Sequence, residues 1–263
     1  MWRHDTLQTS PVPTGCIICF HSISDASRDE LRYPPKSFEA LCRYWQDRFE
    51  MVSLSALLAP APDAAPAPAR MRLAITFDDG YADNAEIAAP ILYRMSLEAT
   101  FFIVTGCLDR ACAPHWYDAR KAPRMMHWQL ARELENAGFR LGSHTCSHAR
   151  LSQLSATERQ HELEQPLQRL RAELRSPSLD FAIPYGWPQD CRELDRAAIR
   201  AAGYRCAMDC YGGVYAAGDD LYHLKRMSIS PRYHGTPREW QRAWDAEVAR
   251  WQRAGASRAA RAQ

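Results

Sequence analysis

Two adjacent aspartates, Asp78 and Asp79, follow a short apolar segment and precede a glycine. Residues 71–75 are typical of a buried strand, and Gly80 predicts a turn directly after it. In β/α folds the C-terminal ends of the strands carry the catalytic groups. Because neighbouring side chains on a strand point to opposite faces, both carboxylates can serve one site only if the strand end bends. Taken alone, the pair is more typical of a solvated turn than of a catalytic site.

Two histidines four positions apart, His144 and His148, follow another short strand candidate at 139–141. Neutral imidazoles suit zinc and related ions, and a carboxylate oxygen can complete a three-ligand site that leaves a position open for water. A third strand candidate ends in the Ile-Pro-Tyr-Gly segment at 183–186. Paired histidines are ordinary on a protein surface, but their combination with the aspartates and this third strand end favours a catalytic metal site.

These segments resemble the motifs of the polysaccharide deacetylase family, metal-dependent carbohydrate esterases that include chitin and peptidoglycan deacetylases. The matching segments are Thr-Phe-Asp-Asp-Gly at 76–80, His144 with His148, and Phe-Ala-Ile-Pro-Tyr-Gly at 181–186. They occur in the family's order, and the resemblance covers residues 15–229. It implies a distorted β/α barrel and hydrolysis of an acetyl group on a saccharide.

The resemblance also implies a role for each motif residue. Asp78 would be the catalytic base, while Asp79, His144 and His148 would hold a divalent metal. The backbone N–H of Tyr185 would help to bind the oxyanion. Zinc is the expected metal, with cobalt and nickel as alternatives.

Two histidines compete to protonate the leaving nitrogen. Leu-Tyr-His at 221–223 matches the late Leu-x-His motif of many family members, but His223 precedes the strand candidate at 224–229 instead of ending it. His21 directly follows the first strand candidate, at 15–20. This arrangement resembles a circularly permuted branch of the family, including deacetylases of bacterial poly-N-acetylglucosamine export, in which the late motif has moved to the N-terminus. We therefore favour His21 as the general acid.

One position departs from the family pattern. The third motif often carries an arginine two positions before its proline, where this chain has Ala182. That arginine normally holds the base aspartate, so its support must come from elsewhere. Arg226, in the last strand candidate, is the expected substitute, although an exposed arginine at a strand end would fit the sequence equally well.

Aromatic side chains on loops that follow strands are candidates for stacking on sugar rings. They are Tyr81, Trp116, Tyr117 and Trp187. The residues expected to contact the oxyanion or the substrate are Tyr185, Pro184, Trp187 and Trp116. For each aromatic residue taken singly, packing in the core or within a loop is at least as good an interpretation.

Composition restricts the class of protein. The chain has 263 residues, 46% of them hydrophobic and 24% charged, which suits one globular domain with a substantial core. The net charge of +2 gives no reason to expect nucleic acid as a partner. Residues 1–5 lack the apolar segment of a signal peptide, and no apolar run reaches transmembrane length.

Nine cysteines show no spacing typical of disulfides. Cys16 and Cys19 would point to opposite faces of a strand, which favours core packing over a redox or zinc role. Free buried thiols fit a reducing compartment, so we expect a cytoplasmic protein.

Strands and helices alternate along the chain, which predicts an α/β fold with a mostly parallel sheet covered by helices. Further strand candidates lie at 51–54, 100–104, 179–183 and 204–208, and helix candidates at 37–49, 85–95, 126–137, 155–174, 192–202 and 237–253. We expect one deacetylase domain over 1–263, with a distorted (β/α) barrel of about seven strands. Its core would span about 15–230, followed by a helix at about 237–253 and a basic tail at 254–263.

The predicted activity is metal-dependent N-deacetylation of an amino sugar in a glycan or a lipid-linked saccharide. One alternative is another hydrolase on this scaffold, acting on an O-acetyl ester or a small or formyl amide. The other is a catalytically inactive glycan-binding domain, which the presence of a base, three ligands and an acid candidate disfavours. The sugar, the chain length of the substrate and the oligomeric state are not predicted.

Overall fold

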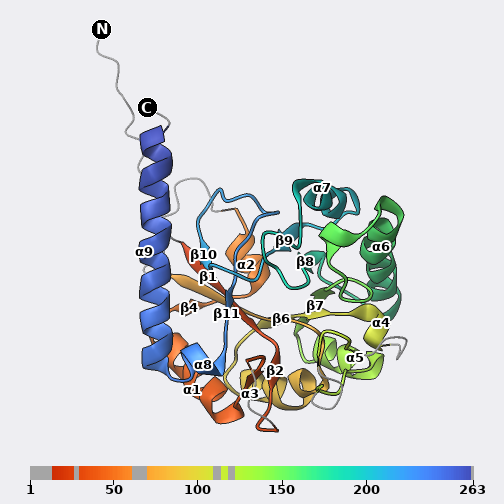
Figure 1. Ribbon diagram of the computed structural model, residues 1–263. Helices are drawn as coiled ribbons and strands as arrows, with labels where there is room; N and C mark the ends of the chain where they lie inside the picture. The colour runs from red at the N-terminus through yellow and green to blue at the C-terminus, as the bar shows by residue number, and fades with distance from the viewer. Residues whose placement is uncertain (1–13, 27–29, 61–69, 109–113, 118–121, 262–263) are drawn as a thin grey trace.

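The structure is a computed structural model that describes residues 14–26, 30–60, 70–108, 114–117 and 122–261, with only the backbone described for 255–261. Residues 1–5 and most side chains of the expected basic tail therefore lie outside the described residues. A curled sheet of nine strands forms the centre (Figure 1). Seven strands follow one path, in the order β10-β1-β5-β6-β7-β8-β9, and the other two, β4 and β11, pair with β5 and β1.

All described pairings in this sheet are parallel except that of β1 with β10. The main path is open between β9 and β10, so the sheet is an incomplete barrel, which confirms the predicted class. The strands are β1 Gly15–Phe20, β2 Ser22–Ile23, β3 Arg32–Tyr33, β4 Glu50–Met51, β5 Arg72–Phe77, β6 Ala99–Ile103, β7 Arg140–Ser143, β8 Asp180–Ala182, β9 Cys206–Met208, β10 Val214–Tyr215 and β11 Met227–Ser228.

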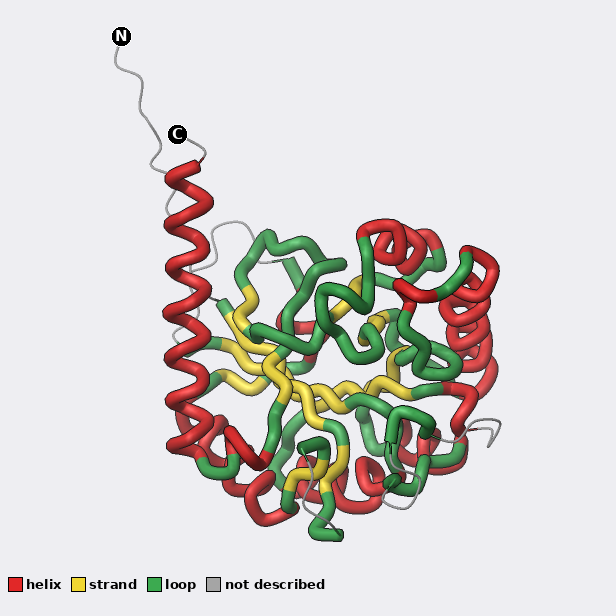
Figure 2. Tube along the Cα trace, viewed as in Figure 1, coloured by secondary structure: helices red, strands yellow, loops and turns green. Residues whose placement is uncertain are grey.

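Helices flank the sheet below, to the left and to the right in the view of Figure 2, and loops and the helix at Glu193–Ala201 lie above it. The helices are α1 Pro35–Arg48, α2 Leu54–Leu58, α3 Ala89–Arg94, α4 Thr105–Leu108, α5 Trp128–Asn136, α6 Ala156–Glu173, α7 Glu193–Ala201, α8 Pro231–His234 and α9 Pro237–Arg261. A π-helical turn, η1 Asn84–Ala88, precedes α3, and a 3₁₀ turn, η2 Leu151–Gln153, precedes α6.

Several boundaries differ from those predicted. Helix α1 begins at Pro35 and not at Ser37, because a proline fits the first turn, where no N–H bond is lost. The strand expected to end at residue 54 stops at Met51, since the Ser53 side chain caps α2 instead. The last strand shrinks to β11, and α9 continues beyond residue 253 to Arg261.

A row of phenylalanines fixes the strand ends that carry the site. Phe20, Phe77 and Phe101 are register partners on β1, β5 and β6, and all three are fully buried. Their rings stack with centroids 5.5 Å and 4.9 Å apart. Because β1 and β5 run parallel in this register, the residues that follow them, His21 and Asp78, emerge at the same edge of the sheet.

Candidate active site

The three candidate metal ligands converge after β5 and β7. Asp79 Oδ1 lies 3.4 Å from His144 Nε2 and 3.4 Å from His148 Nε2. Asp79 has a left-handed backbone with φ of 72°, which supplies the bend that two adjacent aspartates need to serve one site. His148 is also left-handed, with φ of 63°. Non-glycine residues in this left-handed conformation cluster at functional sites, which supports a functional site at these three residues.

The surroundings of these side chains fit a divalent metal. All three are buried, at 1% to 4% exposure, and Asp79 Oδ1 has no hydrogen-bond partner among the described residues. The Ala182 carbonyl lies 2.8 Å from His144 Nδ1, which leaves Nε2 facing Asp79. Burial lowers the pKa of His148 to about 4, so its imidazole is neutral at pH 7, the form that binds metal. One carboxylate and two imidazoles suit zinc, cobalt or nickel.

Trp116 lies against this centre and not in an open groove. Its ring stacks on His148, with centroids 4.1 Å apart and planes at 26°. Its indole N–H lies 3.3 Å from Asp79 Oδ2 and 3.0 Å from the Tyr81 hydroxyl. It therefore helps to orient the carboxylate whose other oxygen faces the histidines. Tyr81 is fully buried, so of the two interpretations left open for it the structure favours packing over stacking on a sugar.

The loop between the two histidines is anchored by Glu162 of α6, a contact that the sequence did not indicate. Its carboxylate accepts hydrogen bonds from the Cys146 and Ser147 N–H groups, each at 2.9 Å. The Thr145 hydroxyl accepts the His148 N–H at 2.9 Å. These local bonds hold His148 where its ring meets Asp79.

Asp78 forms a buried, bidentate ion pair with Arg226. The guanidinium donates to Asp78 Oδ1 at 2.7 Å and to Oδ2 at 2.6 Å, and the two side chains are 2% and 0% exposed. Arg226 also donates to the Asp209 carbonyl at 2.9 Å and to Thr76 Oγ1 at 3.3 Å. Burial by itself raises the pKa of Asp78, but the charge and hydrogen bonds of Arg226, together with the nearby His144 and His21, more than offset this, so the pKa lies below its ordinary value. Arg226 thus supplies the arginine that the third motif lacks.

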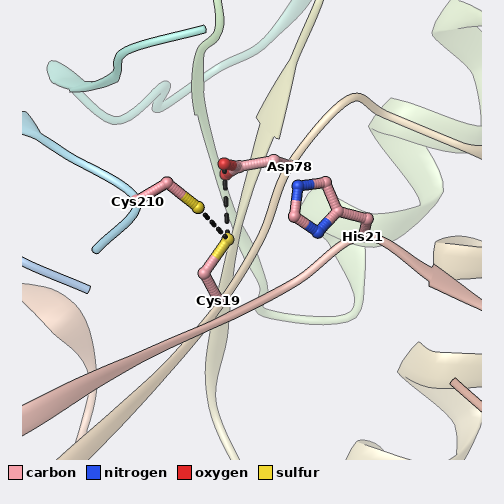
Figure 3. Close-up of side chains that lie close together, drawn as sticks. All are labelled: Cys19, His21, Asp78 and Cys210. Carbon is pink, nitrogen blue, oxygen red and sulfur yellow. Dashed lines mark hydrogen bonds between the residues drawn. The ribbon is translucent and has the colours of Figure 1, made fainter. Parts of the chain in front are cut away.

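The two acid candidates lie in different surroundings. His21 follows β1 and lies beside Asp78, Cys19 and Cys210, as Figure 3 shows. Its carbonyl accepts a hydrogen bond from the buried Asn84 side chain at 2.7 Å. His223 is 39% exposed, and its Nε2 lies 3.2 Å from Glu193 at the start of α7.

Tyr185 has φ of 61°, and within the described part of the chain its N–H donates to no backbone carbonyl. Its ring lies between His148, with centroids 4.7 Å apart, and the Arg150 guanidinium, 3.6 Å from the ring centre. Arg150 in turn pairs with the buried Asp190. Gly186 is required here, because a Cβ would come within 2.5 Å of the Cys210 nitrogen.

The other residues grouped with Tyr185 differ in exposure. Pro184 is buried, whereas Trp187 is 54% exposed and stacks nearly parallel to Tyr211, with ring centroids 6.0 Å apart. Trp187 and Tyr211 follow β8 and β9, so they offer an open aromatic surface at the carboxyl edge of the sheet.

The cysteines differ in part from expectation. Seven of those described are free, while Cys107 is disulfide-bonded, so the prediction of free thiols is wrong at that position. Cys16 packs in the apolar core, as predicted. The Cys19 side chain instead faces Asp78, with Cys19 Sγ 3.4 Å from Asp78 Oδ2. Among the described helices, none is both long and apolar enough to cross a membrane.

The sequence profile of the family described as polysaccharide deacetylase matches residues 66–207. A protein of Bacillus subtilis (strain 168), named as the polysaccharide deacetylase YxkH, is 26% identical over 222 residues, which are 84% of this chain and 73% of that protein.

Two solved structures share the fold. Streptococcus pyogenes deacetylase PplD, in complex with acetate, superposes with a TM-score of 0.71 at 21% identity, covering 88% of this chain and 98% of that one. IcaB from Ammonifex degensii superposes with a TM-score of 0.70 at 20% identity, covering 84% and 94%. With the profile match over more than half of its length, the chain belongs to the polysaccharide deacetylase family.

Proposed function

We propose that this protein, as one deacetylase domain, removes the acetyl group from an N-acetylated amino sugar in a glycan or a lipid-linked saccharide. The observation that carries this proposal is the juxtaposition of two buried groups at one edge of the sheet. Asp79, His144 and His148 form a set of metal ligands, and the adjacent Asp78 is ionised by its pair with Arg226. Amide hydrolysis needs both parts.

Each residue then has a chemical task. A divalent metal held by Asp79, His144 and His148 would polarise the acetyl carbonyl and activate water. Asp78 accepts the proton of the attacking water, and the Tyr185 N–H donates to the developing oxyanion. His21 donates a proton to the departing amine, which leaves poorly without one.

We also infer membership of the circularly permuted branch. The first strand, β1, lies in the sheet between β5 and the last strand, β11, and ends directly before His21. An acid that many relatives carry late in the sequence would here come from the N-terminal strand. The pairing of His223 with Glu193 supports the same choice.

A deacetylation screen tests the proposal. Purified protein supplied with zinc, cobalt or nickel is assayed on N-acetylated oligosaccharides, with free amine, acetate and formate measured separately. Acetate with equal free amine is expected. Formate release, or acetate without amine, would instead identify the small-amide or O-ester hydrolase, and no release with any metal would favour the glycan-binding domain.

Two variants test the assigned roles. His148→Ala should lose both metal and activity, because it removes a ligand. Asp78→Asn should retain the metal held by Asp79, His144 and His148 but lose about 10²–10⁴-fold in kcat, the usual contribution of general-base catalysis. Unchanged metal content in His148→Ala by elemental analysis, or near-normal kcat in Asp78→Asn, contradicts these assignments.

The cytoplasmic location stays a prediction. Seven free thiols support it, whereas the Cys107 disulfide is more typical of an oxidising compartment. Cell fractionation with an antibody to the protein distinguishes the two.

A further inference from the structure

A second cluster of ligand-type side chains lies beside the proposed acid and base. Cys19, His21, Asp78 and Cys210 each offer one donor atom, and these four atoms lie within 4.8 Å of one another (Figure 3). Cys19 and Asp78 are buried, while His21 and Cys210 are half-buried. The Nδ1 atom of His21 is buried without a hydrogen-bond partner among the described residues. His21 therefore has one ring nitrogen without a described partner, while its other ring nitrogen faces Asp78 and Cys210 (Figure 3).

The spacing of these donors matches a tetrahedral metal site. With Zn–S bonds of about 2.3 Å and Zn–O bonds of about 2.0 Å, a tetrahedron places its sulfurs about 3.8 Å apart and sulfur about 3.5 Å from oxygen. Here the two Sγ atoms are 3.7 Å apart, and Cys19 Sγ lies 3.4 Å from Asp78 Oδ2. Two thiols, an imidazole and a carboxylate are also the donors that zinc and cobalt prefer.

The charges of the cluster also suit a dication. With both thiols protonated, the buried Asp78–Arg226 pair is neutral. A divalent cation that displaces two thiol protons to solvent adds two positive charges and leaves two thiolates, so the cluster stays neutral. Anion and cation are thus balanced in a region from which water is largely excluded, which avoids the large free-energy cost of a buried net charge.

We propose that Cys19, Cys210, His21 and Asp78 form a second site for a soft divalent cation such as zinc, separate from Asp79, His144 and His148. Binding is a ligand exchange with release of two protons, and it needs no oxidant. If the proposed function is right, the bound cation also blocks catalysis, because it occupies both the acid and the base. The binding itself does not depend on that function.

Cobalt binding to the full chain tests the site directly. The thiols are kept reduced with a phosphine, and Co²⁺ is added in steps while the near-ultraviolet thiolate-to-cobalt absorption is recorded. The first site has only oxygen and nitrogen ligands, so this absorption reports the cysteines alone. We expect two cobalt ions per chain by elemental analysis, with the absorption tracking one of them.

Variants make the outcome decisive. Cys210→Ser, at a half-buried position, should remove the absorption, and so should Cys19→Ser if it folds. Cys146→Ser, which alters another half-buried cysteine, should retain it. The proposal is overturned if the reduced wild-type chain binds one cobalt without thiolate absorption. It is equally overturned if the absorption persists when Cys19 and Cys210 are both replaced.

A zinc titration of activity tests the inhibitory effect. Activity should rise with the first equivalent and fall by roughly 10²-fold or more with the second, the range expected when acid–base catalysis is lost. In Cys210→Ser the fall should disappear. A second zinc that binds without inhibition would refute the blocking of His21 and Asp78. No activity at any zinc level in Cys210→Ser, with the thiolate absorption of the wild-type chain intact, would refute the proposed function and leave the second site standing.

Discussion

Replacing Arg226 should damage stability and catalysis together. Arg226→Ala leaves the Asp78 carboxylate buried at 2% exposure without the two short bonds, 2.6 Å and 2.7 Å, that now neutralise it. Removing one partner of such a pair typically costs about 3–5 kcal/mol of unfolding free energy. The pKa of Asp78 should rise, because burial then acts without the compensating arginine. The base would be partly protonated, and the acid limb of the pH profile of kcat/KM should move to higher pH.

The measurements are urea unfolding, kcat/KM from pH 5 to 9 and metal content. Arg226→Lys is the milder variant, since lysine retains the charge but cannot form the bidentate contact, so it should fold and still lose about tenfold or more in kcat/KM. A matched control is Arg205→Ala, which breaks the bidentate pair with Asp180 at bonds of 2.8 Å and 2.7 Å. Arg205 is 46% exposed and precedes β9, so its loss should destabilise less and leave kcat/KM close to wild type.

An unchanged pH profile and kcat/KM in a folded Arg226→Lys protein would refute this reasoning. So would a loss in Arg205→Ala as large as that in Arg226→Ala, because the effect would then be general destabilisation and not control of the base.

Three further predictions follow from the site and its support. His21→Ala should impair hydrolysis of an N-acetyl sugar far more than that of an activated aryl acetate, because the leaving group of the acetate needs no proton. His223→Ala should leave kcat/KM for both substrates nearly intact. The reverse pattern would assign the general acid to His223. Burial raises the pKa of Asp83 from 3.8 to about 6. Between these two pH values the native state holds a proton that the unfolded chain has released, so the unfolding free energy falls as the pH rises from about 4 to about 6. Asp83→Asn should remove that contribution, which denaturant unfolding at several pH values between 4 and 6 would show. Trp187→Ala should raise KM about threefold to tenfold with little change in kcat, whereas Tyr93→Ala, at an even more exposed aromatic position on α3, should change neither. No difference between them would exclude Trp187 from sugar binding.

Local sequence patterns predicted the parts of the fold that depend on nearby residues. β1 was predicted at residues 15–20, where it lies, because an unbroken apolar run indicates a buried strand. The start of the α6 helix at about residue 155 was also predicted, and a capping box between Ser155 and Glu158 fixes it there. The two-residue strands β10 and β11 were missed or overextended, since so few residues show no periodicity.

The candidate site shows the same division. The turn after β5 carries its own signal in Asp-Asp-Gly, and the geometry places Asp79 beside the histidines. The sequence contains no local signal for the contact of Trp116 with Asp79 or for that of Cys19 with Cys210. The two cysteines lie 191 positions apart, and they meet where the chain passes from β9 to β10, the neighbour of β1 in the sheet. Arg226 was expected near Asp78 solely because a family position was vacant at Ala182.

The separation between Asp78 and Arg226 in the chain has a consequence for biosynthesis. The two residues lie 148 positions apart, so the carboxylate leaves the ribosome long before its arginine. Until Arg226 emerges, burial of an ionised Asp78 is unfavourable by several kcal/mol, and the end of β5 has reason to stay hydrated. The acid–base half of the site therefore closes last, while Asp79, His144 and His148 all precede that step. A nascent chain arrested before β11 could bring the three proposed metal ligands together and still lack the ion pair that supports the proposed base.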